Sequence, residues 1–214
     1  MKPYYETELG KLYHGDCLEI IPMLEPVDLV LTDPPYGIGL EYGVYVDTEE
    51  NWFNLMEKVI PLIIGLSKMT ILPSCKIKRL EWIYTNFPPD WLICWYKGSP
   101  GHAAFIGFND WEPHLVYGRT KNQLYMHDYF QTKPSPKKGT VGHPCPKPIE
   151  WANWLIDKAT DKNNTILDPF LGSGTTAIAC ERLNRRWIGI EIEEKYCEIA
   201  AKRIEQERKQ LKLF

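Results

Sequence analysis

The residues best suited to chemistry stand at the end of an apolar run. Thr32-Asp33-Pro34-Pro35-Tyr36-Gly37 follows Val27 to Leu31. The prolines fix φ and offer carbonyl oxygens with no competing N–H, so a carboxylate, a rigid carbonyl and an aromatic ring share one stiff corner. Asp33 and the Pro34 carbonyl can accept hydrogen bonds from an exocyclic NH₂, and Tyr36 can stack on the ring that carries it. A Pro-rich turn with a capping Asp is the alternative interpretation.

A second candidate site is a glycine-rich turn. The segment from Asp168 to Ala177 reads Asp-Pro-Phe-Leu-Gly-Ser-Gly-Thr-Thr-Ala, after one apolar run and before a helical pattern. Gly172 and Gly174 let the backbone turn tightly and approach a ligand. The pattern matches the general fingerprint of a nucleotide-binding turn, without the lysine of a P-loop.

Polar side chains around this turn fit the same interpretation. Thr175 and Thr176 stand at the start of the helical pattern, where hydroxyls and N–H groups favour a carboxylate or a phosphate. Glu191 ends the next apolar run and can accept hydrogen bonds from ribose hydroxyls. A purely structural glycine turn remains the alternative. A third segment, His143-Pro144-Cys145-Pro146-Lys147-Pro148, is a rigid entry to a helix and indicates nothing more by itself.

Alternating strands and helices must position these segments. Apolar runs predict strands over residues 12–14, 27–32, 69–72, 91–96, 112–117, 165–167 and 187–190. Helical spacing predicts helices over residues 16–24, 51–67, 76–86, 149–159, 175–183 and 193–213, with a kink or break at Pro61. This alternation favours a doubly wound, mostly parallel α/β sheet. Ligands bind such sheets at the carboxyl ends of the strands, where the candidate residues stand.

Residues 98–110 and 119–148 show little periodicity and read as long loops or an inserted lobe. Residues 119–148 carry six Lys or Arg against one Asp, a net of +5, whereas residues 1–60 carry twelve Asp or Glu against three Lys, a net of −9. A basic segment in an acidic chain can mark the place where a polyanion binds, although a solvated loop is the simpler interpretation. Trp91 and Trp95 could stack on bases, but their strand settings favour core packing.

Composition limits the class of protein. The chain has 214 residues, of which 44% are apolar and 25% charged, as in a single globular domain. No run is long enough to span a membrane, and the polar N-terminus lacks the apolar core of a secretory signal. The six cysteines and five histidines are scattered without metal-ligand spacing. We therefore expect an intracellular protein with no metal site.

Together, the three segments resemble motifs of the amino-group DNA methyltransferases that use S-adenosylmethionine. Asp33-Pro34-Pro35-Tyr36 is similar to the catalytic motif of that family, and Asp168 to Thr176 to its cofactor motif. The catalytic motif comes first, an order that resembles the β group of the family. The resemblance implies a Rossmann-like, doubly wound α/β sheet of seven mostly parallel strands. It also implies one domain over residues 1–214, with a loop-rich target-recognition insertion at about 98–142.

The resemblance implies roles for particular residues. The catalytic set would be Asp33, Pro34, Pro35 and Tyr36. The set that binds S-adenosylmethionine would be Asp16, Lys147, Asp168, Phe170, Gly172, Ser173, Gly174, Thr175, Thr176 and Glu191. Within the insertion, Lys133, Lys137 and Lys138 are the candidates for contact with DNA phosphates.

The activity that follows from the resemblance is transfer of a methyl group to an exocyclic nitrogen of a base in DNA. The Asp in the first motif position favours N6 of adenine over N4 of cytosine, and the base would have to be flipped out of the duplex. N4-cytosine methylation is the first alternative, and an NAD-dependent oxidoreductase that uses the glycine turn is a more distant one. The expected setting is the cytoplasm of a bacterium or of a virus-infected host cell, as in restriction-modification. A homodimer is left open.

Overall fold

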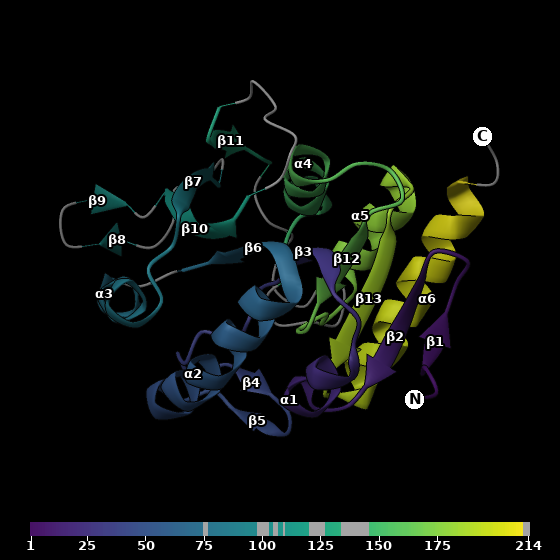
Figure 1. Ribbon diagram of the computed structural model, residues 1–214, viewed down its shortest axis with the longest axis horizontal. Coiled ribbons are helices and arrows are strands. Elements are labelled where there is room, and N and C mark those ends of the chain that lie inside the picture. The colour runs from purple at the N-terminus through teal and green to yellow at the C-terminus, as the bar shows by residue number, and fades with distance from the viewer. Residues whose placement is uncertain are drawn as a thin grey trace.

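A nine-stranded sheet runs through the described part of the chain, in the order β1-β2-β13-β12-β3-β6-β10-β7-β11 (Figure 1). The computed structural model describes residues 1–74, 77–97, 103–104, 107–108, 110–119, 127–133 and 146–211. The strands of this sheet are β1 (Tyr5–Glu6), β2 (Gly10–His14), β3 (Val27–Leu31), β6 (Ser67–Pro73), β7 (Trp91–Tyr96), β10 (Trp111–Gly118), β11 (Tyr129–Gln131), β12 (Thr165–Asp168) and β13 (Arg186–Glu191).

Strands β2, β13, β12, β3 and β6 are mutually parallel, so their carboxyl ends share one edge of the sheet. Strand β10 is antiparallel to both β6 and β7, and β11 is parallel to β7. The carboxyl ends of β7 and β11 therefore lie at that same edge, together with the first residues of β10. We call it the site edge.

The doubly wound α/β class is confirmed, but the count of seven strands is not. The sheet gains β1, which pairs antiparallel with β2, and β11, which lies in a segment predicted to be loop. Both are two or three residues long and sit at the outer edges of the sheet, where a short run carries no readable periodicity.

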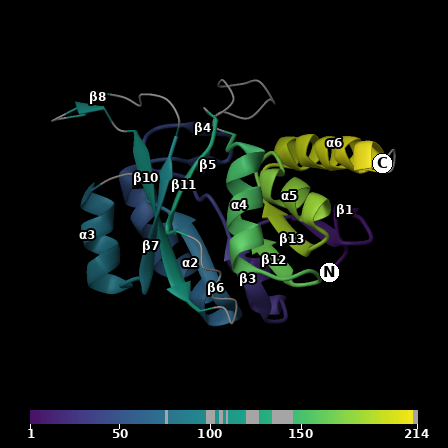
Figure 2. The same ribbon diagram turned by 90° about the horizontal axis from the view of Figure 1, so that it is seen from above.

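Helices cover both faces of the sheet. Helices α4 (Ile149–Ala159), α5 (Thr175–Leu183) and α6 (Glu194–Leu211) lie side by side on one face (Figure 2). The other face is covered by α1 (Cys17–Ile20), the 3₁₀ turn η1 (Ile21–Met23), α2 (Glu49–Leu66) and α3 (Ile77–Asn86). Two small hairpins, β4 (Glu41–Tyr42) with β5 (Tyr45–Val46) and β8 (Ala103–Ala104) with β9 (Gly107–Phe108), complete the described elements.

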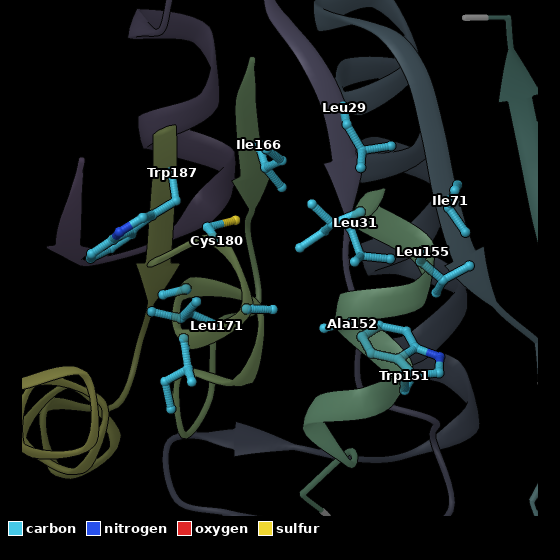
Figure 3. Close-up of a cluster of buried hydrophobic side chains, with 14 of the residues drawn as sticks. Leu29, Leu31, Ile71, Trp151, Ala152, Leu155, Ile166, Leu171, Cys180 and Trp187 are labelled. Atoms are coloured by element: carbon cyan, nitrogen blue, oxygen red, sulfur yellow. The ribbon is translucent and has the colours of Figure 1, made fainter. Parts of the chain in front are cut away.

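Strand β3 shows why the central strands read as unbroken apolar runs. Leu29 and Leu31 pack in the cluster beneath α4, α5 and α6, while Val30 belongs to the cluster beneath α1 and α2 (Figure 3). All three side chains are fully buried. Because successive side chains point to opposite faces, a strand covered on both sides needs apolar residues at every position.

Two predictions differ from the structure, one about the course of a helix and one about the burial of a side chain. A kink or break is expected at Pro61, but helix α2 continues through it without a break, and its face around Met56, Ile60 and Ile63 is fully buried. Packing of that face holds the helix together across the hydrogen bond that Pro61 cannot donate. Trp91 is 62% exposed rather than in the core, and its Nε1 donates to Asp128.

No helix in the described part of the chain is long and apolar enough to cross a membrane. Among the same residues, no group of three or more His, Cys, Asp or Glu side chains is arranged to hold a metal ion. Lys137 and Lys138, and most of the predicted insertion at 98–142, lie outside the described residues.

Candidate active site

One cavity gathers most of the predicted site residues at the site edge. The chain brings them from the ends of β2, β3, β12 and β13 and from the segment before α4. The predicted residues that line this cavity are Asp16, Asp33, Pro35, Lys147, Asp168, Phe170, Gly172, Ser173, Thr175, Thr176 and Glu191. Pro34 and Tyr36 are buried beside the cavity rather than on its wall, and Gly174 begins α5 just behind it.

The catalytic candidate Asp33 is held by a cation. Its side chain is 20% exposed, and both of its carboxylate oxygens lie 2.8 Å from the ammonium nitrogen of Lys147. The hydroxyl of Tyr36 donates to Asp33, and the same ammonium donates to that hydroxyl. Lys147 also lies 4.9 Å from the centre of the Tyr36 ring. The carboxylate, the ammonium and the hydroxyl thus form a closed network of charge-assisted hydrogen bonds.

The backbone and the side chain of Lys147 contact two different parts of the site. Its backbone carbonyl accepts a hydrogen bond from Thr175 Oγ1 at 3.3 Å, which ties it to the glycine-rich turn. Its side chain runs the other way, to Asp33. The backbone of Lys147, predicted to be a cofactor residue, thus contacts the glycine-rich turn, whereas its charge lies on Asp33.

A second carboxylate, not predicted from sequence, stands behind this corner. Glu112 is the second residue of β10, and its Oε1 lies 3.8 Å from the Lys147 ammonium. Because β10 is antiparallel to β6, its first residues reach the site edge. The available signal was an acidic residue at the start of the strand predicted over residues 112–117.

The glycine-rich turn is shaped by positive φ angles and by the helix behind it. Gly172 has φ 53° and Gly174 has φ 85°. A Cβ atom on Gly174 would lie 3.1 Å from the Cβ of Ala200 on α6. The turn therefore needs glycine at this position for both its backbone conformation and its contact with α6. Ser173, predicted to touch a cofactor, accepts a hydrogen bond from Arg203 at 2.9 Å through its hydroxyl.

Two buried carboxyl groups lie at the ends of β12 and β13. Burial raises the pKa of Glu191 to about 7, although its oxygens accept hydrogen bonds from the backbone N–H groups of Gly172 and Glu193. Burial likewise raises the pKa of Asp168 to about 6, against the lowering effect of hydrogen bonds that include one from Thr32 Oγ1 at 2.7 Å. The strand ends thus place two carboxyl groups that titrate near neutral pH on one cavity wall.

The loop that follows Tyr36 is clamped by Asp47. This buried carboxylate accepts hydrogen bonds from the backbone N–H groups of Gly37, Ile38 and Leu40 at 2.5 to 3.0 Å. On the other side, Arg79 Nη2 donates to the Gly37 carbonyl at 3.1 Å. The backbone after the catalytic motif is therefore fixed by two buried charged side chains.

The β4–β5 hairpin adds aromatic residues that sequence reasoning missed. Tyr42 and Tyr45 line the cavity from the hairpin, and Tyr196 lines it from α6. Val44, at the turn of the hairpin, donates its N–H to Glu193. The Tyr45 hydroxyl is buried without a hydrogen-bond partner among the described residues. Buried polar groups are almost always hydrogen-bonded, so a partner for this hydroxyl is missing on this wall of the cavity.

Comparison with known proteins gives consistent results. A sequence model described as DNA methylase, for N6 and N4 methylation, matches residues 91–202, just over half of the chain. The chain is 28% identical to the type II methyltransferase M.ScaI of Streptomyces caespitosus, over 98% of this chain and 86% of the relative. It is 26% identical to M2.DpnII of Streptococcus pneumoniae, over 96% and 93% of the two chains.

Solved structures agree with the fold. A structure titled as a complex of M1.HpyAVI with SAM superposes with a TM-score of 0.66 at 27% identity, covering 91% of this chain and all of that one. The PvuII DNA methyltransferase, described as cytosine-N4-specific, superposes with a TM-score of 0.73 at 16% identity, over 96% and 93% of the two chains. At that identity the second likeness concerns the fold alone.

Proposed function

Because the chain belongs to the DNA methylase family of N6 and N4 amino methyltransferases, we propose that it methylates the exocyclic N6 of a flipped-out adenine in DNA, with S-adenosylmethionine as methyl donor. The observation that supports this proposal is that Asp33 lines the same cavity as the glycine-rich turn and Glu191. The carboxylate proposed to bind the base and the turn proposed to bind the cofactor thus line one cavity. The alternative of an NAD-dependent oxidoreductase is set aside, because it gives the Asp33 corner no role and because the chain belongs to the DNA methylase family.

The residues of the cavity fit the methyl donor, which when bound supplies an electrophilic methyl group on a sulfonium. Glu191 at the end of β13 offers carboxylate oxygens to ribose hydroxyls, as acidic residues do at this position of such sheets. Gly172 and Thr175 bring the turn and the start of α5 to the cavity wall without large side chains. The unsatisfied Tyr45 hydroxyl and the ring of Phe170 give the wall further polar and aromatic contacts.

In the proposed reaction, Asp33 prepares the nucleophile. An exocyclic amino nitrogen is a weak nucleophile because its lone pair is delocalised into the ring. Hydrogen bonds from its two N–H groups to the Asp33 carboxylate and the Pro34 carbonyl hold the lone pair toward the cavity. The methylated nitrogen then releases one proton, for which Asp33 is the adjacent base. Tyr36 stands beside Asp33 as the stacking partner of the ring.

The choice of adenine follows from Asp33 in the first motif position. The target amino group is out of reach inside a duplex, so base flipping is part of the proposal. The insertion at 98–142 is the proposed target-recognition region. Lys133 supports this assignment, because it is exposed and lies two residues after the end of β11, at the site edge.

A nucleoside assay tests the function. The purified chain is incubated with unmethylated DNA and S-adenosylmethionine, and the digested DNA is analysed by mass spectrometry. We expect N6-methyladenine, and we expect Asp33→Ala to lower kcat by about 100-fold or more, because an oriented hydrogen-bond acceptor is lost from the reacting nitrogen. Glu57→Gln, on an exposed position of α2, is the matched control and leaves kcat unchanged.

Each other result has a definite meaning. N4-methylcytosine would keep the mechanism and overturn the choice of base. Near-normal turnover of Asp33→Ala at saturating cofactor would overturn the catalytic assignment. If the wild-type chain binds the cofactor but forms no methylated nucleoside on DNA, the proposed substrate is wrong.

A further inference from the structure

Resting on the proposed function, we propose that Glu112 is a positioning residue for catalysis: it receives the Lys147 ammonium when the target base takes its place on Asp33. The corner described above would then have two arrangements. In one, Lys147 lies on Asp33, and in the other, Lys147 lies on Glu112 while Asp33 accepts the amino group of the base.

The first argument is competition for the acceptor oxygens of Asp33. In the structure, the ammonium of Lys147 is 2.8 Å from both of them and also donates to the Tyr36 hydroxyl, which itself donates to Asp33. An incoming amino group needs one of the same oxygens. A base can therefore form its hydrogen bond to Asp33 only if the ammonium gives up part of its contact.

The second argument is the state of Glu112. Its side chain is 11% exposed, and its Oε1 is buried with no hydrogen-bond partner among the described residues. The Lys147 ammonium is 3.8 Å away, beyond hydrogen-bond distance. Buried acceptors are almost always satisfied, and an unsatisfied one in a native protein calls for a functional explanation. A shift of about 1 Å would bring the ammonium into a hydrogen bond with this oxygen.

The third argument is charge. Removing one partner from a buried ion pair is strongly unfavourable, because it leaves an uncompensated charge in a low dielectric. With a carboxylate on each side, Lys147 can leave Asp33 and remain paired. The move also takes a positive charge away from the amino nitrogen, which itself becomes positive as it accepts the methyl group. Glu112 therefore acts on the reaction through Lys147 and does not touch the base.

A double-mutant cycle tests the proposal. Glu112→Gln keeps the shape of the side chain and removes its charge, so the ammonium stays on Asp33. We expect kcat to fall roughly 10- to 100-fold, the scale of a small misplacement at a reacting centre, with cofactor affinity unchanged. When Lys147 is already replaced by Gln, the added Glu112→Gln substitution should change kcat by less than about twofold, because no ammonium remains to move to Glu112.

The outcomes separate this proposal from the function it rests on. Glu57→Gln again serves as the control, and thermal unfolding checks that each variant is folded. If Glu112→Gln lowers kcat by the same factor in both backgrounds, the residue is merely structural and the proposal is overturned while the methyltransferase stands. A wild-type chain that does not methylate DNA overturns the function and the proposal together.

A structural measurement needs no turnover. In a crystal structure of the wild-type chain with S-adenosylhomocysteine and target DNA, we expect Lys147 Nζ within hydrogen-bond distance of Glu112 and an amino group on Asp33. An adenine amino group on Asp33 with Lys147 still bound to both Asp33 oxygens would overturn the proposal.

Discussion

At the residue scale, Glu191 has a consequence for stability. Burial raises its pKa from the model-peptide value of 4.5 to about 7, so in the folded protein it stays protonated at pH values where the unfolded chain has already lost the proton. A raised pKa contributes stability that is fully present below the unfolded value and is lost as the pH rises through the folded one. The contribution of Glu191 to the free energy of unfolding therefore falls as the pH rises from about 4.5 to about 7.

Glu191→Gln should abolish that part of the pH dependence. The slope for a single such group is at most about 1.4 kcal/mol per pH unit, and urea unfolding at several pH values from 4.5 to 8 measures it. Asp168, with its pKa raised to about 6, adds a slope of the same sign that remains in the variant. Buried His114, with its pKa lowered to about 3, gives the opposite slope below its unfolded value. Identical pH dependence in wild type and variant would contradict the assignment to Glu191.

Single residues also mark how far the sequence could predict the site. Asp33, Asp168 and Glu191 were found because each ends an apolar run, and the carboxyl ends of parallel strands meet at one edge. The side-chain position of Lys147 and the presence of Glu112 could not be predicted in this way. Both depend on the direction of β10 and on which of two neighbouring groups a flexible cation reaches, and neither is encoded in local spacing.

At the scale of elements, the glycine-rich turn can be tested against a turn of similar backbone conformation. Gly174 has φ 85° and lies against Ala200, whereas Gly39 has φ 80° and has nothing within 4 Å of the place where a Cβ would be. Alanine at either position costs about 1 kcal/mol for the left-handed backbone. Only Gly174→Ala also pushes α5 and α6 apart.

We therefore expect Gly174→Ala to destabilise the protein by about 1 to 3 kcal/mol more than Gly39→Ala, the usual range for overpacking. Urea unfolding measures the difference. Calorimetric titration should also show weaker S-adenosylmethionine binding in Gly174→Ala, because this residue is the N-cap of α5, whose first residue, Thr175, lies on the cavity wall. Equal losses of stability in the two variants would show that the contact with α6 does not matter.

Elements with strong periodicity were predictable, and those held by long-range contacts were not. Residues 149–159 form α4 as predicted, with one apolar face buried, and residues 175–183 form α5 as predicted, although that helix is buried over most of its surface. No pattern in the sequence predicted the β4–β5 hairpin. Its strands are two residues long, and it is fixed by contacts made elsewhere, through the N–H of Val44 to Glu193 and through Asp47.

At the scale of the whole molecule, charge is distributed unevenly over an acidic chain. Net charge is −3, yet residues 119–148 carry a net of +5, six Lys or Arg against one Asp. Lys133, the described member of the predicted phosphate-binding set, is exposed beyond β11 at the site edge. The proposed DNA surface and the proposed catalytic cavity thus lie at the same edge of the sheet.

Replacing Lys133, Lys137 and Lys138 together by alanine tests this surface. Each phosphate contact contributes about 0.9 to the slope of log K against log salt concentration, so the slope should become shallower by about 2.7. Fluorescence anisotropy with labelled duplex DNA over a salt series measures both affinity and slope. Lys58, Lys202 and Lys209 are exposed on α2 and α6, and their triple alanine variant is the control. Unchanged affinity and slope in the first variant would remove these lysines from the interface.

The strand order also governs when the protein becomes active during its own synthesis. Strand β3, which carries Asp33, is flanked in the sheet by β6 and by β12, and β12 ends at Asp168. At roughly 5 to 20 residues per second, a ribosome needs on the order of ten seconds to pass from one of these residues to the other. Until then the edge of β3 that pairs with β12 is open, and Asp33 has no glycine-rich turn beside it. The nascent chain therefore cannot modify DNA before β12 and β13 have emerged and inserted between β3 and β2.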